Sequence, residues 1–260
     1  MTGTALRLGR LFRSSGRAFV TAFDHGTTLR MPMSGPGPRE VLSTIVDSGP
    51  DGVLLSAGML ATNADLFARR GAPVPVVRAD WTVIDEDWKA ESGEFHRVVV
   101  TPAEAAAMGA GAICMYLIGG PATGEMFAGN VAAVAKAAHE ADRVGIPLIV
   151  EATLWGSRHT DKKDPEAVQH MCRIAYELGA HAIKTEFTGD VESMRQVIGS
   201  VGVPVLTLGG ARGAADAVEA AARDAITAGA KGLIFGRNVW AADDPITTTK
   251  NLLDIVHGAA

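Results

Sequence analysis

The chain has 260 residues, a formal net charge of -5 at pH 7, 30 glycines and 47% hydrophobic residues, of which few are aromatic. This composition suits a large core of small aliphatic side chains joined by tight turns, and it excludes a disordered chain. The negative net charge offers no general attraction to nucleic-acid phosphates. No apolar run is long enough for a membrane-spanning helix, so we expect a soluble protein with a small-molecule partner, without nucleic acid or membrane.

The first 17 residues carry four arginines and no acidic residue. Transit peptides share this pattern, but the leucines between the arginines can also pack as a short helix, and we favour an N-terminal helical extension over residues 1–17. Cys114 lies in an apolar run and Cys172 in a helical one, without the spacing of a metal site, which predicts buried free thiols. Such thiols are typical of a reducing cytoplasm, where we expect the protein to be located.

Short runs rich in valine, isoleucine and leucine recur along the chain and predict eight strands. They lie at residues 18–23, 52–56, 74–79, 112–117, 147–152, 181–185, 204–208 and 232–235. Helical patterns separate them, several entered through a capping residue, as at Thr101, Asp164 and Asp190. Glycines before five of the strands predict the turns at which the preceding helices end. These are Gly109, Gly145, Gly179, Gly202 and Gly229.

Strands that alternate with helices indicate a parallel α/β fold, and the regular unit length favours a closed (β/α)8 TIM barrel. An open doubly wound sheet fits less well, because no early Gly-x-Gly-x-x-Gly turn is present. No shift in composition marks a linker, so we predict a single domain over residues 1–260. The acidic, polar segment 80–96, with Trp81 and Trp88, predicts an insertion after strand three. It either covers the site, contacts a neighbouring subunit or is an ordinary solvated loop.

A lysine near the end of the sixth predicted strand is the sharpest functional signal. The phrase Ala182-Ile183-Lys184-Thr185 places an amine in an apolar strand, where a charge is costly, and Glu186 follows at the same strand end. Two interpretations fit Lys184: a structural ion pair with Glu151 or Asp24, or a desolvated amine that attacks a ketone carbonyl to form a Schiff base. The strand pattern alone leaves both open.

Polar side chains also follow the first and fifth predicted strands, and barrel enzymes build their sites at the C-terminal strand ends. Asp24 and His25 end the first strand, and Glu151 and Thr153 share one face of the fifth by two-residue alternation. We predict Asp24 and Glu151 as catalytic groups, and His25 and Thr153 as substrate-binding residues. Asp24 could instead cap a nearby loop. Glu151 is either an acid–base group or the charge partner of Lys184.

Glycine pairs follow the last two predicted strands. Gly209-Gly210 comes after the seventh strand and Gly236-Arg237 after the eighth. Glycine lets backbone N–H groups approach a phosphate, and this end of a barrel is where such sites form, so we predict that these four residues bind phosphate. Arg212 and Arg237 either add cationic contacts or are surface residues.

The seven histidines of the chain show no compact metal-ligand motif. One of them, His181, precedes the sixth predicted strand and is therefore expected at the opposite end of the barrel from Lys184. We predict no catalytic metal.

Four phrases at the strand ends occur together in one known family. They are Phe23-Asp24-His25-Gly26, the run from Ile183 to Asp190 (IKTEFTGD), Leu208-Gly209-Gly210-Ala211 and Phe235-Gly236-Arg237-Asn238. Over nearly its whole length the chain resembles the archaeal-type class I fructose-bisphosphate aldolases and their DeoC–LsrF-type relatives. The resemblance implies a Schiff base on Lys184, an Asp24 that orients or protonates substrate, and phosphate binding by the glycine backbones. It also implies a homo-oligomer, often ring-like, and no cofactor beyond the covalent lysine.

One phrase departs from that family pattern. Where fructose-bisphosphate aldolases of this type have Tyr-Pro-Arg-Gly, this chain reads Thr153-Leu154-Trp155-Gly156. The phenol that the resemblance assigns to proton transfer is absent, and so is the neighbouring arginine charge. We therefore expect a phosphorylated ketose other than fructose 1,6-bisphosphate, with proton transfer by Glu151, Asp24 or a bound water.

Three functions remain open at this point. The first is a class I aldolase, a carbon–carbon lyase that cleaves or forms a bond in a ketose phosphate. The second is a lysine-dependent transfer enzyme of the thiolase or transaldolase kind. Dependence on coenzyme A would distinguish it from an aldolase. The third is a non-catalytic sugar-phosphate-binding protein, whose binding would survive Lys184→Arg without any detectable reaction.

Overall fold

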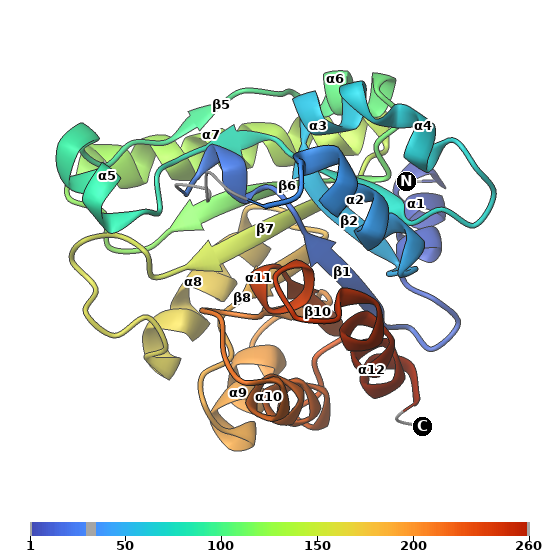
Figure 1. Ribbon diagram of the computed structural model, residues 1–260. Coiled ribbons are helices and arrows are strands. Elements are labelled where there is room, and N and C mark those ends of the chain that lie inside the picture. The colour runs from blue at the N-terminus through green and yellow to red at the C-terminus, as the bar shows by residue number, and fades with distance from the viewer. Residues whose placement is uncertain (1, 30–34, 259–260) are drawn as a thin grey trace.

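The computed structural model describes residues 2–29 and 35–258. Eight parallel strands close into a barrel in the order β1-β10-β9-β8-β7-β6-β3-β2, with helices around it (Figure 1). The barrel strands are β1 Ala18–Ala22, β2 Gly52–Ser56, β3 Val74–Arg78, β6 Ala112–Ile118, β7 Leu148–Thr153, β8 Ala182–Thr185, β9 Val205–Leu208 and β10 Gly232–Phe235. The predicted TIM barrel is confirmed, and each predicted strand end lies within one residue of the observed end.

Prolines account for two of these one-residue differences. Pro147 and Pro204 lie just before β7 and β9, because a proline has no N–H to donate to the strand ladder. Their carbonyl groups still accept hydrogen bonds, from the N–H of Ile113 at 2.9 Å and from the N–H of Ile183 at 2.8 Å. Each proline therefore precedes its strand and still accepts a hydrogen bond from the neighbouring strand.

The helices alternate with the barrel strands or precede them. They are α1 Thr2–Leu11, the 3-10 turn η1 His25–Thr27, α2 Pro38–Asp47, α3 Ala57–Thr62, α4 Ala64–Phe67, α6 Pro102–Ala107, α7 Gly124–Val144, α8 Pro165–Glu177, α9 Val191–Gly199, α10 Ala215–Thr227, α11 Arg237–Trp240 and α12 Pro245–Gly258. The predicted caps are confirmed: Thr101 forms a reciprocal capping box with Glu104, and Asp164 and Asp190 accept from the first-turn N–H groups of α8 and α9.

Glycines end four helices as predicted. Gly109, Gly145, Gly179 and Gly229 have φ angles of 85°, 70°, 95° and 107°, a region in which side chains other than glycine are strained. The prediction was wrong for Gly202, which has no positive φ. A Cβ at Gly202 would instead lie 3.0 Å from the hydroxyl oxygen of Tyr176, so close packing is the reason for glycine there.

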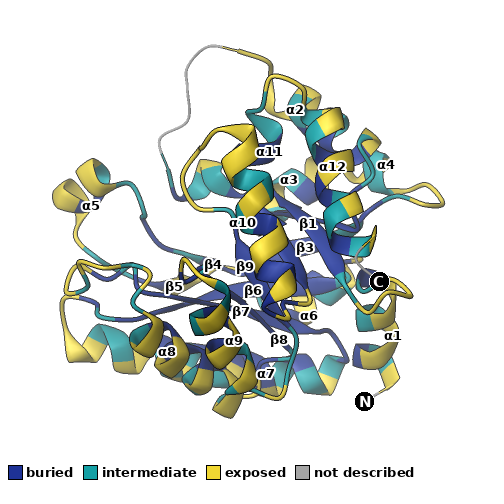
Figure 2. Ribbon diagram, turned by 90° about the horizontal axis from the view of Figure 1, so that it is seen from below, coloured by how far each residue is buried: buried dark blue, intermediate teal, exposed yellow. Residues whose placement is uncertain are grey.

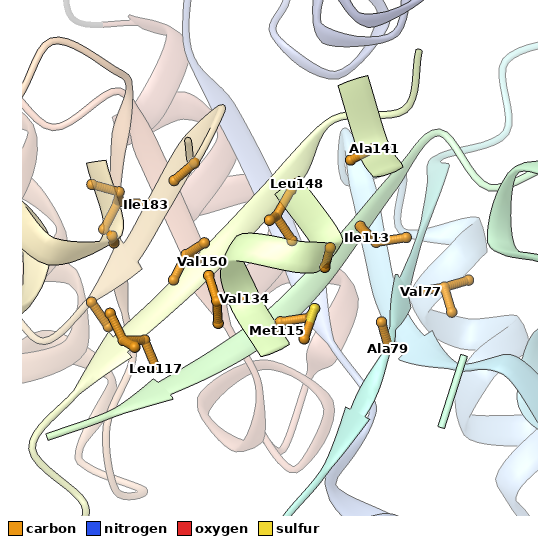
Figure 3. Packing of buried hydrophobic residues seen from close by; sticks show 14 of the residues in the cluster. Val77, Ala79, Ile113, Met115, Leu117, Val134, Ala141, Leu148, Val150 and Ile183 are labelled. Atoms are coloured by element: carbon orange, nitrogen blue, oxygen red, sulfur yellow. The ribbon is translucent and has the colours of Figure 1, made fainter. Parts of the chain in front are cut away.

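The outer face of the barrel packs against the surrounding helices. Figure 2 shows the strands as the buried centre and the helices as half-exposed elements around it. In Figure 3, Val134 and Ala141 of α7 lie in the same apolar cluster as Ile113, Met115 and Leu148 of β6 and β7. This layer anchors the strands, so the positions of their C-terminal ends are set by tight packing.

A separate apolar cluster fills the N-terminal half of the barrel interior. It contains inward-facing residues of the strands, such as Val20, Leu54 and Ile149, together with Leu11 from α1. A Cβ at Gly52 would lie 2.9 Å from a Leu11 methyl carbon, so glycine at this position makes room for Leu11. The first helix thus closes one end of the barrel and leaves the C-terminal end for polar groups.

A small antiparallel sheet, β4 Asp80–Trp81 with β5 Arg97–Val98, and helix α5 Glu86–Ser92 lie between β3 and α6. The Trp81 indole N–H donates to the carbonyl of Thr27 at 2.7 Å. The Lys89 ammonium donates to the carbonyl of Trp155 at 3.1 Å. The segment is therefore bonded to the loops that follow β1 and β7, both at the C-terminal end of the barrel.

Both cysteines are free and buried, as predicted. Burial raises the pKa of the Cys114 and Cys172 thiols to about 12, which leaves both protonated and unreactive at neutral pH. Within the described part of the chain, we find no helix with the length and apolar character needed to cross a lipid bilayer.

The packing of Leu11 in the N-terminal end of the barrel yields a first prediction. Leu11 is fully buried, so Leu11→Ala is expected to lower the free energy of unfolding by about 2–5 kcal/mol through lost burial and the cavity left behind. Urea denaturation followed by circular dichroism measures the loss. Leu6, on the same helix, is 60% exposed and provides the control Leu6→Ala. Equal effects of the two substitutions would contradict this role of Leu11.

Candidate active site

A cavity of about 190 Å³ opens among the C-terminal ends of the barrel strands. Its lining comprises Ala22, Asp24, His25, Thr28, Leu29, Ile84, Tyr116, Glu151, Trp155, Lys184, Glu186, Leu208, Gly209, Gly210, Ala211, Ile234, Gly236 and Arg237. Eight of the nine residues predicted for the site are in this lining, although they come from five strand ends spread over the chain. The size suits a small metabolite, because pockets for drug-sized ligands occupy about 300–1,000 Å³.

Thr153 is the predicted site residue outside this lining. It is the last residue of β7, it is 1% exposed, and its hydroxyl oxygen has no hydrogen-bond partner among the described residues. Trp155, two positions further along the chain, lines the cavity instead. The binding role of Thr153 stays a prediction.

Lys184 and Glu151 are paired across adjacent strands of the barrel. They are register partners on β8 and β7, so their side chains project from the same level. The Lys184 Nζ atom lies 2.7 Å from Glu151 Oε1, and the two side chains are 7% and 1% exposed. The ion pair expected under the first interpretation of Lys184 therefore exists, and it lies in the wall of the cavity that the second interpretation requires.

Arg78, the last residue of β3, connects the carboxylates of the site. Its Nε–H donates to Asp24 Oδ2 at 2.7 Å, and its Nη2 atom pairs with Glu151 Oε2. The guanidinium carbon also lies 3.8 Å from the centre of the Tyr116 ring. Arg78 is 2% exposed. The two buried carboxylates of Asp24 and Glu151 are thus balanced by two buried cations, Arg78 and Lys184.

This network determines the ionisation of Asp24. Burial by itself raises the pKa of the carboxyl group, but the charges of Arg78, His25 and Lys184 and the Arg78 hydrogen bond outweigh it and hold the pKa at about 2. Asp24 is therefore a carboxylate at neutral pH. His25 lies beside it, with its Nδ1 atom 3.9 Å from Asp24 Oδ1, and burial lowers the pKa of this imidazole.

Asp80 holds Arg78 from behind. One of its oxygens accepts from the backbone N–H of Tyr116 at 2.6 Å and lies 2.7 Å from His96 Nε2. The other lies 3.6 Å from Arg78 Nη1. Because Asp80 and His96 flank the segment between β3 and α6, that segment is connected to the charged centre of the barrel.

A third carboxyl group, that of Glu186, lies at the cavity and contacts the loop after β7. The Trp155 indole N–H donates to Glu186 Oε1 at 3.0 Å, and the Trp155 ring centre lies 5.7 Å from that of Tyr116. Glu186 is 6% exposed. Burial raises the pKa of Glu186, the Trp155 hydrogen bond opposes this rise, and the negative charge of Glu151 adds to it.

The glycines after β9 and β10 also line the cavity. The Asn238 amide donates to the carbonyls of Gly209 and Ala211 at 2.7 and 3.1 Å, which fixes the loop after β9.

A Cβ at Gly236 would lie 2.3 Å from His25 Cε1, so only glycine lets the imidazole pack there. The Nε atom of Arg237 is buried and has no hydrogen-bond partner among the described residues.

Two further expectations concern cations and metals. Arg212 is a surface residue: its side chain is 60% exposed and pairs loosely with Asp243 at 3.7 Å. His181 lies at the N-terminal end of β8, where its Nδ1 atom accepts from the N–H of Leu148 at 3.2 Å, opposite Lys184 as predicted. Among the residues that the structure describes, no three histidine, cysteine, aspartate or glutamate side chains are grouped to hold a metal ion.

The prediction from sequence missed Arg78, Tyr116 and Trp155. Arg78 carries the same signal as Lys184, a charge that ends an apolar strand, and could have been found from it. Tyr116 lies within a fully buried strand, where an aromatic residue is ordinarily part of the core. Trp155 was read only as the loss of an arginine, because its hydrogen bond to Glu186 depends on the path of a loop.

Comparison with known proteins agrees with this geometry. The family model of the DeoC/LacD family aldolases matches residues 18–242. An uncharacterized aldolase of Saccharolobus solfataricus is 33% identical over 261 residues, covering 99% of this chain and 95% of the relative. The 2-amino-4,5-dihydroxy-6-oxo-7-(phosphonooxy)heptanoate synthase of Streptomyces griseus is 30% identical over 263 residues, covering 98% of this chain and 90% of the relative.

Solved structures give the same result. An archaeal fructose 1,6-bisphosphate aldolase superposes with a TM-score of 0.83 at 25% identity, covering 98% of this chain and 100% of that one. A second archaeal structure, with the same score, identity and coverage, has its catalytic lysine covalently bound to the carbinolamine intermediate of the substrate. The chain is therefore an enzyme of the DeoC/LacD family of aldolases.

Proposed function

We propose that this protein is a Schiff-base aldolase that cleaves or forms a carbon–carbon bond in a phosphorylated ketose other than fructose 1,6-bisphosphate. The observation that carries the proposal is the buried Lys184, 2.7 Å from a carboxylate that can take its proton, at a cavity that Arg237 also lines. The first group supplies the nucleophile and the second a contact for phosphate.

The position of Glu151 supports activation of the lysine. Transfer of one proton from the Lys184 ammonium to Glu151 leaves a neutral amine, which attacks the ketone carbon to form a carbinolamine. Glu151 then returns the proton to the departing hydroxyl, and water and an iminium result. The iminium accepts the electron pair of the breaking carbon–carbon bond, so the chemistry needs no cofactor besides the lysine.

Asp24 is placed to orient the substrate. Because Arg78 holds its pKa at about 2, Asp24 is an acceptor throughout the neutral range and can bind a substrate hydroxyl group. His25 packs between Asp24 and the Gly236 backbone and so connects the carboxylate to the end of the neighbouring strand β10. Both residues fit a polyhydroxylated ligand.

The charge of the cavity favours a single phosphate. Among the described residues that line the cavity, Lys184 and Arg237 have cationic side chains, and the imidazole of His25 is cationic when protonated. Trp155 and Ile84 also line the cavity, and neither side chain carries a charge that would bind a second phosphate. The Streptomyces relative is named for a compound with one phosphonooxy group. We therefore infer a monophosphorylated ketose, bound at Arg237 and the backbones of the neighbouring glycines.

Chemical trapping tests the nucleophile. Sodium borohydride added with a panel of phosphorylated ketones and ketoses, including dihydroxyacetone phosphate, is expected to fix a reduced adduct on Lys184, which peptide mass mapping locates. Lys184→Arg should abolish the adduct, whereas Lys231→Arg, at an exposed lysine, should leave it unchanged. An adduct confined to a different residue would refute the assignment.

Phosphate recognition is tested separately. Arg237→Gln is expected to raise the dihydroxyacetone phosphate concentration for half-maximal trapping by about 10- to 100-fold, since a charged hydrogen bond contributes about 1.5–3 kcal/mol. Trapping with unphosphorylated dihydroxyacetone should hardly change. The exposed Arg212 provides the control Arg212→Gln. Equal losses for both ketones would mean that Arg237 does not contact phosphate.

The role of Arg78 predicts a stability effect. Arg78→Gln leaves two buried carboxylates with one cation, and the free energy of unfolding at pH 7 is expected to fall by about 3–5 kcal/mol in urea denaturation. The exposed pair of Arg39 and Asp65 gives the control Arg39→Gln, with a much smaller effect.

The same variant should change the pH dependence of stability. The folded-state pKa of Asp24 is about 2, below the ordinary 3.8, so its contribution is present above about pH 4 and is lost as pH falls toward 2. Without Arg78 the folded-state pKa rises, and this part of the acid-induced loss should shrink. An unchanged difference between the stabilities at pH 5 and pH 2.5 would contradict the proposed network.

A further inference from the structure

Glu186 is a buried carboxyl group at the cavity that takes no part in the ion pairs of Lys184 and Arg78. It follows Lys184 by two residues at the end of β8 and lines the same cavity. Its hydrogen-bond donor is the neutral indole N–H of Trp155, at 3.0 Å. A buried carboxyl group held by a hydrogen bond therefore lines the same cavity as the reacting lysine.

The other two carboxylates of the site are poorly suited to exchange protons with the substrate. Asp24 is held as an anion by the Arg78 hydrogen bond. Glu151 pairs with Arg78 and Lys184, and its proton exchange serves the lysine amine. A group that alternately takes and releases a proton near neutral pH needs an environment that stabilises both of its forms. Of the three carboxyl groups, Glu186 accepts from a neutral donor, the Trp155 indole N–H, and forms no ion pair among the described residues.

The charges around Glu186 agree with such a role. Burial disfavours its carboxylate form, and Glu151 adds repulsion. The Trp155 hydrogen bond and the more distant cations of Lys163 and Lys184 favour the carboxylate, but the net effect is a raised pKa. A raised carboxyl pKa is the usual property of a glutamate that works as an acid and a base in turn.

We propose that Glu186 is the catalytic residue that exchanges protons with the substrate in the carbon–carbon bond step, and that Trp155 is its positioning residue. This inference rests on the proposed Schiff-base function. It also gives a role to the sequence Thr153-Leu154-Trp155-Gly156, because Trp155 brings a neutral donor to Glu186 where the Tyr-Pro-Arg-Gly phrase has an arginine. A glutamate and an indole then replace a phenol and a guanidinium.

The step balances as follows in the cleavage direction. The Glu186 carboxylate takes the proton of the hydroxyl group on the carbon that forms the far end of the breaking bond, seen from the iminium. That carbon becomes an aldehyde, and the electrons of the bond pass into the iminium to give an enamine on Lys184. Glu186 then returns its proton to the enamine carbon and restores the iminium. Water adds to the iminium, and the ketone leaves with Lys184 as an ammonium.

Glu186→Gln separates this role from Schiff-base formation. Turnover of the ketose phosphate identified by trapping is expected to fall by about 10²- to 10⁴-fold, while the borohydride adduct on Lys184 still forms. Glu186→Asp should recover part of the turnover. Glu177→Gln, at an exposed residue of α8, should keep full turnover. Full turnover in Glu186→Gln, or loss of its adduct, would overturn the inference, whereas absence of an adduct in the unsubstituted enzyme would refute the Schiff-base function itself.

The pH dependence of turnover is a second test, because a purely structural role of Glu186 would leave it unchanged. This test remains available if Glu186→Gln does not fold. In the cleavage direction the carboxylate is the active form, so turnover declines as pH falls through the Glu186 pKa. The Trp155 hydrogen bond lowers that pKa, and Trp155→Phe is therefore expected to move the acid limb of the profile to higher pH. An acid limb that stays in place in Trp155→Phe would overturn the inference.

Discussion

The guanidinium group of Arg78 joins the two carboxylates on which the site depends. Asp24 and Glu151 project into the barrel from β-strand ends, where an unpaired charge would be costly, and Arg78 and Lys184 compensate them. The pairing does more than offset desolvation. It keeps Asp24 ionised and places a proton acceptor against the lysine, so the charge balance of the barrel determines which chemistry each group can perform.

The barrel separates stability from chemistry along its axis. One end is apolar and closed by Leu11 of α1, and the outer face is packed against helices. The other end carries the charged groups and the cavity. A well-packed frame allows charges that are costly to bury to be held at the opposite end, because Arg78 and Lys184 need partners at fixed distances.

The segment between β3 and α6 belongs to the wall of the site. Trp81 bonds it to the loop after β1, and Lys89 donates to the backbone carbonyl of Trp155. Trp155 in turn donates to Glu186, and Ile84 reaches the cavity lining. Lys89 of α5 thus holds the backbone of Trp155, and the Trp155 indole in turn holds the carboxyl group of Glu186. Of the arrangements expected for this segment, coverage of the site is the one that these contacts favour.

Periodicity, capping residues and helix-ending glycines are local signals, and they were enough to determine the eight strands, their order of alternation with helices and the strand ends that carry polar groups. The four phrases at the strand ends, including the one around Lys184, together indicated the family. Contacts between residues far apart in the chain were decided by the tertiary structure. Arg78 meets Asp24 and Glu151 because the strand order places β1 and β7 two strands to either side of β3, and Trp155 meets Glu186 because a loop is held by its neighbours. Local propensities contain no information on such distances, whereas burial makes each of these polar groups depend on finding its partner.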